Sequence, residues 1–260
     1  MGFGMSHWNG QMGVNVSKDC EGVTDHTMNP VHQDGPVFYT SLTRDTATLK
    51  GQGQDGGGAK HLLISILWEH LVAMKSHLWN HCQSSTKAAF PIQVASGRLG
   101  RPYLLVGEDA GPAISFSAGG GKVWAALCGD ESCIGIDVAG SDEFQSDYPF
   151  QRVFHPEELE HALKLTGGVM EEASALLWSI KEAVVKALGC AFHLVDPLHI
   201  TIYPLVESSG GGYTFPVDVS GKALVRFPLA GGRALRVHSL PQGALWLSIA
   251  LVNRKSTVHE

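Results

Sequence analysis

The chain has 260 residues, of which 44% are apolar and 17% charged, so it can fold around one or two sizeable hydrophobic cores. Its formal net charge of −6 excludes the broadly basic surface that nonspecific nucleic-acid binding requires, although a local basic pocket for one phosphorylated ligand is compatible with it. No apolar run approaches the roughly 18 residues of a membrane span, and the first residues lack the pattern of a secretory signal. Five cysteines without a C-x-x-C pair indicate free thiols, so we expect a cytoplasmic protein. From the net charge and the short apolar runs we expect no nucleic-acid or membrane partner.

The N-terminal part of the chain is polar and carries one glycine-rich motif. Residues 1–35 show little periodicity and predict an irregular segment, and residues 37–42 (VFYTSL) predict a short strand. Residues 51–58 (GQGQDGGG) contain a formal G-x-G-x-x-G pattern. A dinucleotide site would need an apolar strand directly before this loop, whereas TRDTATLK precedes it, so a flexible loop is favoured.

A first helix is predicted from Lys60 to about Cys82, because leucines recur at helical spacing along one side. A second stripe on this helix holds three histidines, which are His70, His77 and His81. They could hold a metal ion if space surrounded the three rings, but a polar border to the apolar stripe is the ordinary interpretation.

The middle of the chain predicts a basic loop followed by three strands. Residues 97–104 are rich in turn formers and contain two arginines. Residues 114–117 and 123–127 predict two strands joined at Gly119–Gly121, and residues 133–138 predict a third strand.

Two helices and a set of strands are predicted for the rest of the chain. One helix begins at Pro156 and ends at Gly167–Gly168, and another covers residues 171–188 and ends at Gly189. Predicted strands follow at 199–203, 223–227, 234–239 and 245–252, with a loop at 208–212. We therefore expect an α+β fold of two similar halves related by pseudo-twofold symmetry, each an antiparallel sheet packed with helices. The segments would be 1–35 (irregular), 36–133 (first half) and 134–260 (second half).

Two segments place charged residues where both a functional and an ordinary structural explanation are open. In residues 134–138 (IGIDV), Asp137 ends an apolar strand, where a carboxylate is costly to bury unless a cation neutralises it. Trp178, Glu182 and Lys186 are four residues apart and so share one helix face. Taken alone, the first pattern also fits a solvated strand end, and the second fits a surface ion pair.

Together these segments resemble the paired signatures of the phosphopantetheinyl transferases, G-(I/V)-D and W-(S/C)-x-K-E-(A/S)-x-x-K. They stand about 40 residues apart, as in that family, and the chain length resembles the monomeric surfactin-synthetase-activating subgroup. The resemblance covers the chain from about Lys60 to the C-terminus. It implies transfer of 4′-phosphopantetheine from coenzyme A to a serine of an acyl or peptidyl carrier protein, as in holo-acyl-carrier-protein synthases, with Mg²⁺ as cofactor.

The resemblance also implies roles for individual residues. Asp137 and Glu182 would bind Mg²⁺, Glu182 would take the serine proton, and Lys186 would stabilise the phosphates. Four further residues would bind the coenzyme, which are Lys60, Arg101 of a G-(K/R)-P segment, Ser117 and Lys181. A carrier would dock on a face near Val153, Phe154 and Leu159.

Two positions depart from the family pattern. Ala118 replaces a common histidine that contacts the 3′-phosphate, and Ala139 replaces a second acid that many relatives have. A binding module of the same fold that no longer catalyses is therefore a second hypothesis. An unrelated nucleotide or metal protein that uses the glycine-rich loop or the histidine stripe is a third.

Overall fold

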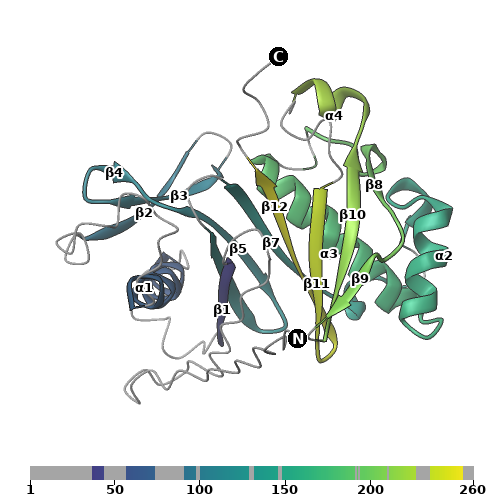
Figure 1. The fold of residues 1–260 in the computed structure, drawn as a ribbon. Coiled ribbons are helices and arrows are strands. Elements are labelled where there is room, and N and C mark those ends of the chain that lie inside the picture. The colour runs from purple at the N-terminus through teal and green to yellow at the C-terminus, as the bar shows by residue number, and fades with distance from the viewer. Residues whose placement is uncertain are drawn as a thin grey trace, which may run out of the picture.

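The computed structural model describes residues 37–43, 57–73, 91–97, 100–128, 132–145, 148–190, 192, 194–209, 211–226 and 235–253. Within these residues the fold is α+β, as predicted, and the strand pairs are antiparallel. Figure 1 shows helix α1 with one group of strands, and helices α2 and α3 with another. The pseudo-twofold relation and the segment boundaries stay predictions.

The first group of elements contains two small sheets and one helix. Strands β1 (Val37–Thr43), β6 (Lys122–Cys128) and β5 (Ala113–Gly119) form one sheet in that order. Strands β2 (Ile92–Ser96), β3 (Pro102–Val106) and β4 (Asp109–Ala110) form the other. Helix α1 (Gly57–Ala73) packs against β1 and β6.

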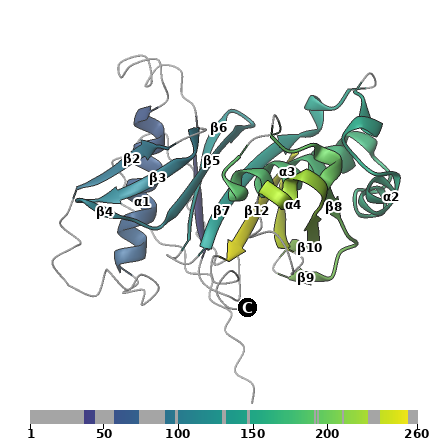
Figure 2. The ribbon, with the colours of Figure 1, turned by 90° about the horizontal axis from the view of Figure 1, so that it is seen from above.

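The second group is a larger sheet covered by helices. Its strands are β7 (Ser132–Gly140), β12 (Leu245–Asn253), β11 (Leu235–Gln242), β10 (Gly212–Val219) and β8 (Ile200–Ile202), in that order, and β9 (Glu207–Ser209) pairs with β10. Helix α3 (Met170–Leu188) packs on β7 and β12, and α2 (Pro156–Leu165) packs on α3 (Figures 1 and 2). Short helices η5 (Ser141–Glu143), η6 (Phe150–Arg152), η7 (Pro197–His199) and α4 (Gly221–Arg226) lie in the connections.

The alternation of side chains along β7 decides which residues face α3. Ile134, Ile136 and Val138 point into an apolar layer shared with β1 and β6. Cys133 and Ala139 belong instead to the core that contains α2 and α3. Because successive side chains of a strand point to opposite faces, Asp137 also points toward α3.

Strand β5 closes the free edge of β7 with side-chain hydroxyls. The backbone N–H of Ile136 donates to Ser115 Oγ at 3.1 Å, and the N–H of Val138 donates to Ser117 Oγ at 3.2 Å. Both serines are buried. These bonds satisfy backbone donors at the edge of β7 and tie the first sheet to the second, as the neighbouring positions of β5 and β7 in Figure 1 illustrate.

Helix α3 lies unusually close to β7 because Gly135 has no side chain. A Cβ atom at position 135 would overlap the carbonyl oxygen of Ala183 and would lie 2.5 Å from the backbone nitrogen of Ala187. Both contacts are with helix backbone, which cannot move aside as a flexible side chain can. Gly135 therefore fixes the distance between α3 and the strand that carries Asp137.

Most predicted elements of the second half are confirmed. The ends of α2 and α3 fall at Gly167–Gly168 and Gly189, which have positive φ angles and terminate the helices as expected. The hairpin between β5 and β6 also turns at the predicted glycines, Gly120 and Gly121.

One predicted strand is wrong, and five strands were missed, of which β4 has only two residues and β9 lies where a loop was expected over residues 208–212. Residues 223–227 were expected to be a strand, but Gly221–Arg226 is helix α4. A short apolar run does not distinguish helix from strand by periodicity, and Val225, its β-branched residue, is 85% exposed. Strand β10 was missed because Pro216 interrupts its pattern, and β2 and β3 were missed beside the turn-rich loop.

Several sequence expectations fall outside the described residues. These are the irregular segment 1–35, the glycine motif Gly51, Gly53 and Gly56, and the end of the first helix with His77 and His81. The side chain of His70 is likewise outside the description. Across the part of the chain that is described, no helix is long and apolar enough to cross a bilayer. Of the described cysteines, Cys128 and Cys133 are buried and Cys190 is partly buried.

We predict that G135A unfolds far more easily than the wild type, by about 3 kcal/mol or more, because the added methyl group would push α3 away from β7. Urea unfolding followed by circular dichroism measures this difference. G97A is the matched control, since a Cβ at position 97 meets its nearest neighbour at an ordinary 3.5 Å, and we expect a change within about 0.5 kcal/mol. Equal stability of the two variants would contradict the role of Gly135.

Candidate active site

Asp137 is buried at the junction of the two sheets and is held by two polar groups. Its side chain is 8% exposed. Oδ1 accepts a hydrogen bond from Ser117 Oγ at 2.9 Å and one from Lys186 Nζ at 2.6 Å. A lysine of α3 therefore neutralises the buried carboxylate, whereas the sequence analysis expected Mg²⁺ at Asp137 and assigned Lys186 to the phosphates.

Glu182 and Lys186 lie one turn apart on α3 and face Asp137. Lys186 Nζ is 3.9 Å from Glu182 Oε2 and is also bonded to Asp137. Both carboxylates thus lie within 3.9 Å of one ammonium nitrogen, although they come from a strand and a helix 45 residues apart. The structure brings together the three residues predicted to act in catalysis.

The electrostatic surroundings of Glu182 favour its protonated form. Burial raises the pKa of Glu182, and the negative charge of Asp137 raises it further, while Lys186 acts in the opposite direction. Glu143 on η5 adds a smaller upward effect. Tyr148 is part of the same neighbourhood, since burial and then Glu143 and Glu182 raise the pKa of its hydroxyl. A carboxylate in such surroundings can accept a proton more readily than a solvated one.

The carboxylate pair fits a magnesium ion in its chemistry. Mg²⁺ binds oxygen ligands and is commonly held by one or two carboxylates together with water and substrate phosphates. Asp137 and Glu182 are adjacent carboxylates that repel each other and already share a positive neighbour in Lys186. Within the described residues no group of three or more His, Cys, Asp or Glu side chains is arranged to hold a metal, so a bound ion would need ligands from the substrate or water.

A pocket of about 240 Å³ lies beside this carboxylate pair and spans the two groups of elements. Its walls include Lys60 of α1, Arg101 before β3, Phe116 of β5, and Lys186 and Gly189 at the end of α3. Among the described residues that line it, three are cations and none is an acid. This local positive charge, in a chain of net charge −6, suits a phosphorylated ligand.

The predicted cations Lys60 and Arg101 are both held at this pocket by neighbouring groups. Lys60 Nζ lies 5.6 Å from the ring centroid of Phe116. Arg101 packs on the C-terminal cap of α3, where a Cβ at Gly189 would lie 2.8 Å from the guanidinium. The arginine therefore closes the space between the first group of elements and α3, and it places a cation at the negative end of that helix.

Ser117 is close to the predicted site, but its hydroxyl is already in use. It donates to Asp137 Oδ1, accepts from the N–H of Val138 at 3.2 Å, and has Lys186 Nζ at 3.4 Å. A serine hydroxyl has one proton and two lone pairs, so these contacts exhaust it. The predicted bond to a coenzyme phosphate would require Ser117 to release Asp137, so this geometry argues against that role.

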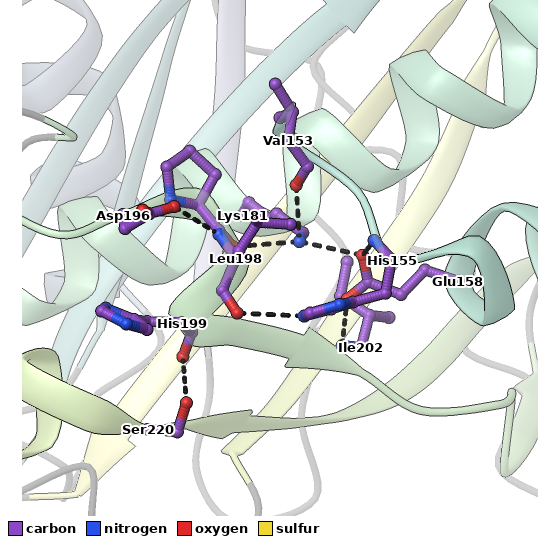
Figure 3. Close-up of polar contacts among 10 residues, drawn as sticks. Val153, His155, Glu158, Lys181, Asp196, Leu198, His199, Ile202 and Ser220 are labelled. Carbon is purple, nitrogen blue, oxygen red and sulfur yellow. Dashed lines mark hydrogen bonds and ion pairs between the residues drawn. The ribbon is translucent and has the colours of Figure 1, made fainter. Parts of the chain in front are cut away.

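Lys181 lies in a different environment from its neighbour Glu182. Its side chain is fully buried, and Nζ contacts Glu158 Oε2 at 2.9 Å and the carbonyl oxygens of Val153 at 2.9 Å and Pro197 at 3.0 Å (Figure 3). Three acceptors match its three N–H donors. Burial lowers the pKa of Lys181, while the ion pair with Glu158 opposes this shift. With every donor used inside the protein, Lys181 is not available to a ligand, and the geometry argues against the predicted coenzyme contact.

Glu158 completes this buried network, and the sequence analysis did not single it out. Its Oε1 accepts from the N–H of Ile202 at 2.8 Å, and Oε2 also accepts from the N–H of His155 at 2.9 Å. The His155 ring donates from Nε2 to the carbonyl of Leu198 at 3.0 Å (Figure 3). The network joins α3, the start of α2, η7 and β8. The capping pattern of Glu158 with His155 was the available sequence signal for it.

The predicted carrier-docking side chains are mostly buried. Phe154 is 1% exposed and Val153 is 8% exposed, and both belong to the core around α2 and α3. The expectation that they form a docking face is wrong, because the Lys181 network draws this segment inward. Leu159 is only partly buried.

The two unusual alanines occupy different environments. Ala139 is buried in the core around α2 and α3, two residues after Asp137 and on the same face of β7. An acid at position 139 would displace apolar packing. Ala118 is exposed, since it points to the opposite face of β5 from Ser117.

We predict that K181M lowers the free energy of unfolding by about 3–5 kcal/mol, because it leaves the Glu158 carboxylate buried without its cation. K164M is the control, since Lys164 forms an exposed pair with Glu160 and its loss should cost less than about 1 kcal/mol. The double variant K181M/E158Q removes the uncompensated charge and should recover part of the loss. Denaturant unfolding measures all three, and a K181M as stable as K164M would contradict this assignment.

We predict that, in metal-free buffer, E182Q is more stable than the wild type at neutral pH. The pKa of Glu182 is raised in the folded protein, so folding favours its protonated form. The folded state therefore loses stability as the pH rises from the usual glutamate pKa through the raised value, and the glutamine variant does not. The stability difference should vanish below about pH 4. Thermal unfolding across this range measures it, and a difference that is independent of pH would contradict the assignment.

A sequence model of the 4′-phosphopantetheinyl transferase superfamily matches residues 133–220, which is less than half of the chain. No curated protein matches the chain. Among solved structures, the Chronobacterium ammoniagenes ACPS–CoA complex is 21% identical with a TM-score of 0.38, over 47% of this chain and 96% of that chain. The Thermotoga maritima holo-acyl-carrier-protein synthase is 19% identical with a TM-score of 0.33, over 46% of this chain and 62% of that chain. The segment that carries Asp137, Glu182 and Lys186 is thus similar in sequence to the 4′-phosphopantetheinyl transferase superfamily.

Proposed function

We propose that this protein transfers the 4′-phosphopantetheine group from coenzyme A to a serine of a carrier protein. The observation that supports this most directly is the position of Lys186, which bonds the buried Asp137, lies 3.9 Å from the half-buried Glu182, and also lines the pocket with Lys60 and Arg101. A phosphate-binding pocket thereby adjoins a pair of carboxylates. The sequence match over residues 133–220, which contain that pair, agrees with the same chemistry.

In this proposal the pocket binds the coenzyme through its phosphates. Arg101 can offer a fork of N–H donors to a phosphate, and Lys60 adds a mobile charge at the pocket edge. Lys186 would exchange part of its contact with Asp137 for an oxygen of the pyrophosphate. The cost of moving it is limited because it is 28% exposed and already lies between both partners.

The proposed reaction joins the carrier serine to the phosphorus that bears pantetheine. The serine Oγ forms a bond to that phosphorus, the P–O bond of the pyrophosphate breaks, and 3′,5′-ADP leaves. Glu182 takes the serine proton, directly or through a water molecule. Lys186 stabilises the negative charge that develops on the leaving phosphate. When bound at Asp137 and Glu182, Mg²⁺ would neutralise the pyrophosphate and polarise the phosphorus.

A second candidate is a binding module of the same fold without catalytic activity, and Ala118 and Ala139 favour it. Both candidates bind coenzyme A, so only turnover separates them. Incubation of the purified protein with coenzyme A, Mg²⁺ and several apo carrier proteins, followed by intact-mass measurement, decides between them. A gain of one phosphopantetheine mass that disappears in E182Q supports the transferase, and coenzyme binding without such a gain supports the module.

We predict that R101A weakens coenzyme A binding by about 10–100-fold, since a charged hydrogen bond contributes about 1.5–3 kcal/mol. The reason is the loss of a phosphate partner, so kcat should change less than KM. Calorimetry and initial rates with varied coenzyme A measure the two effects. K164A removes a cation from an exposed helix face away from the pocket and serves as the control. Equal coenzyme affinity in R101A and K164A would contradict the proposed phosphate site.

A further inference from the structure

Two serines of β5 are matched in almost every respect except their relation to the carboxylate pair. Ser115 and Ser117 are both buried, both project from the same face of the strand, and each accepts one backbone N–H of β7. Either hydroxyl therefore serves the junction between the two sheets. Ser117 alone of this pair is described with contacts to Asp137 and Lys186, at 2.9 and 3.4 Å.

We infer that Ser117 is a positioning residue for the carboxylate of Asp137 and the ammonium of Lys186, and not a ligand of a coenzyme phosphate. The inference rests on the proposed function, whose reacting groups it concerns. Its basis is the direction of the hydrogen bonds around one oxygen. Since the N–H of Val138 donates to Ser117 Oγ, the hydroxyl proton is directed to Asp137 Oδ1, which fixes the rotation of that carboxylate.

The fixed rotation has a consequence for the other carboxylate oxygen. Ser117 and Lys186 both contact Oδ1, and these two contacts do not involve Oδ2. Asp137 can then present Oδ2 to a hard cation without losing the bonds that hold it. Without the serine, Lys186 would be the one partner left to Oδ1 among the described residues, and its amine must also serve the phosphates. Ser117 thus lets Lys186 move while Asp137 stays in place.

This arrangement also gives the first group of elements a role beyond phosphate binding. Ser117 lies on β5, whereas Asp137 and Lys186 belong to β7 and α3. Any displacement of β5 against β7 would change the bonds to Val138 and Asp137 together, because one oxygen makes both. The position of the coenzyme-binding elements is therefore coupled to the orientation of the catalytic carboxylate.

The test compares S117A, S117T and the matched variant S115A with the wild type. Thermal unfolding comes first, and we expect both S115A and S117A to stay folded. S117A should lose more stability, because it loses the bond to the Asp137 carboxylate as well as one acceptor for a β7 N–H. Calorimetry then measures coenzyme A affinity without divalent ions. Electron paramagnetic resonance measures Mn²⁺ affinity with coenzyme A bound, with Mn²⁺ as the probe for a hard divalent cation. Initial rates give kcat and KM.

We expect S117A to keep its coenzyme A affinity within about twofold and to lose about 10–100-fold in Mn²⁺ affinity and kcat, as is typical when a residue that orients a metal ligand is removed. S117T, which retains the hydroxyl, should restore both. S115A should keep the Mn²⁺ affinity of the wild type, although its place in the pocket wall can alter KM for coenzyme A.

Three outcomes would overturn the inference. One is a loss of coenzyme A affinity in S117A with unchanged Mn²⁺ affinity, which would make Ser117 a phosphate ligand. Another is equal behaviour of S117A and S115A in every assay, which would leave Ser117 a purely structural role. The third is the absence of Mn²⁺ binding in the wild type. Failure of the proposed function is separate, since it appears as an absence of carrier modification by the wild type even where Mn²⁺ and coenzyme A bind.

Discussion

The direct contact between α3 and β7 at Gly135 is the constraint on which the site depends. Because no side chain separates the helix from the strand there, the next helical turn places Glu182 and Lys186 beside Asp137, two residues further along β7. Gly135 is needed at this position because a side chain would not fit, and not because of backbone flexibility. The short distance between Asp137 and the charged residues of α3 depends on the absence of a Cβ atom at position 135.

Buried polar bonds hold α3 on both sides of this contact. Ser179 of α3 bonds Ser248 of β12 at 2.7 Å, and Ser248 stands opposite Asp137 in the sheet register. On the other side of α3, Lys181 bonds Glu158 and the carbonyl oxygens of Val153 and Pro197. Residues 179, 181 and 182 of one motif therefore have different surroundings, since the first two hold the helix in place and the third faces Asp137. Fully satisfied networks of this kind favour a single arrangement of the helix over near alternatives.

The charges of the site are arranged so that each compensates another. Asp137 and Glu182 repel one another, which contributes to the raised pKa of Glu182, and Lys186 lies between them. The same lysine borders a pocket whose described walls carry two more cations. An anionic ligand would thus balance the cations of the pocket, and a divalent cation would balance the carboxylates of Asp137 and Glu182. Such complementarity links the two groups of elements energetically as well as geometrically.

The sequence by itself determined the elements whose signals are local. Leucine spacing, the proline and acids at the start of α2, and the terminal glycines of α2 and α3 identified the helices, since helix formation and termination depend on neighbouring residues. The motif resemblance named Asp137, Glu182 and Lys186, and the structure brings them together. Strand β10 and helix α4 were not recognised, because a proline inside a paired strand and a short apolar run are decided by their tertiary surroundings.

Only the tertiary structure decided which charged or polar residues lie at the Asp137–Glu182 pair and which are used within the fold. Lys181 and Glu182 are adjacent in sequence, yet helical geometry turns one into the core and the other toward Asp137. Ser117 matched a phosphate-binding pattern, but its hydroxyl bonds Asp137 and the backbone of Val138, both on β7. No local sequence signal predicts that β5 and β7 lie side by side. Burial and hydrogen-bond saturation are properties of contacts between distant segments, so they cannot be inferred from residue type and spacing.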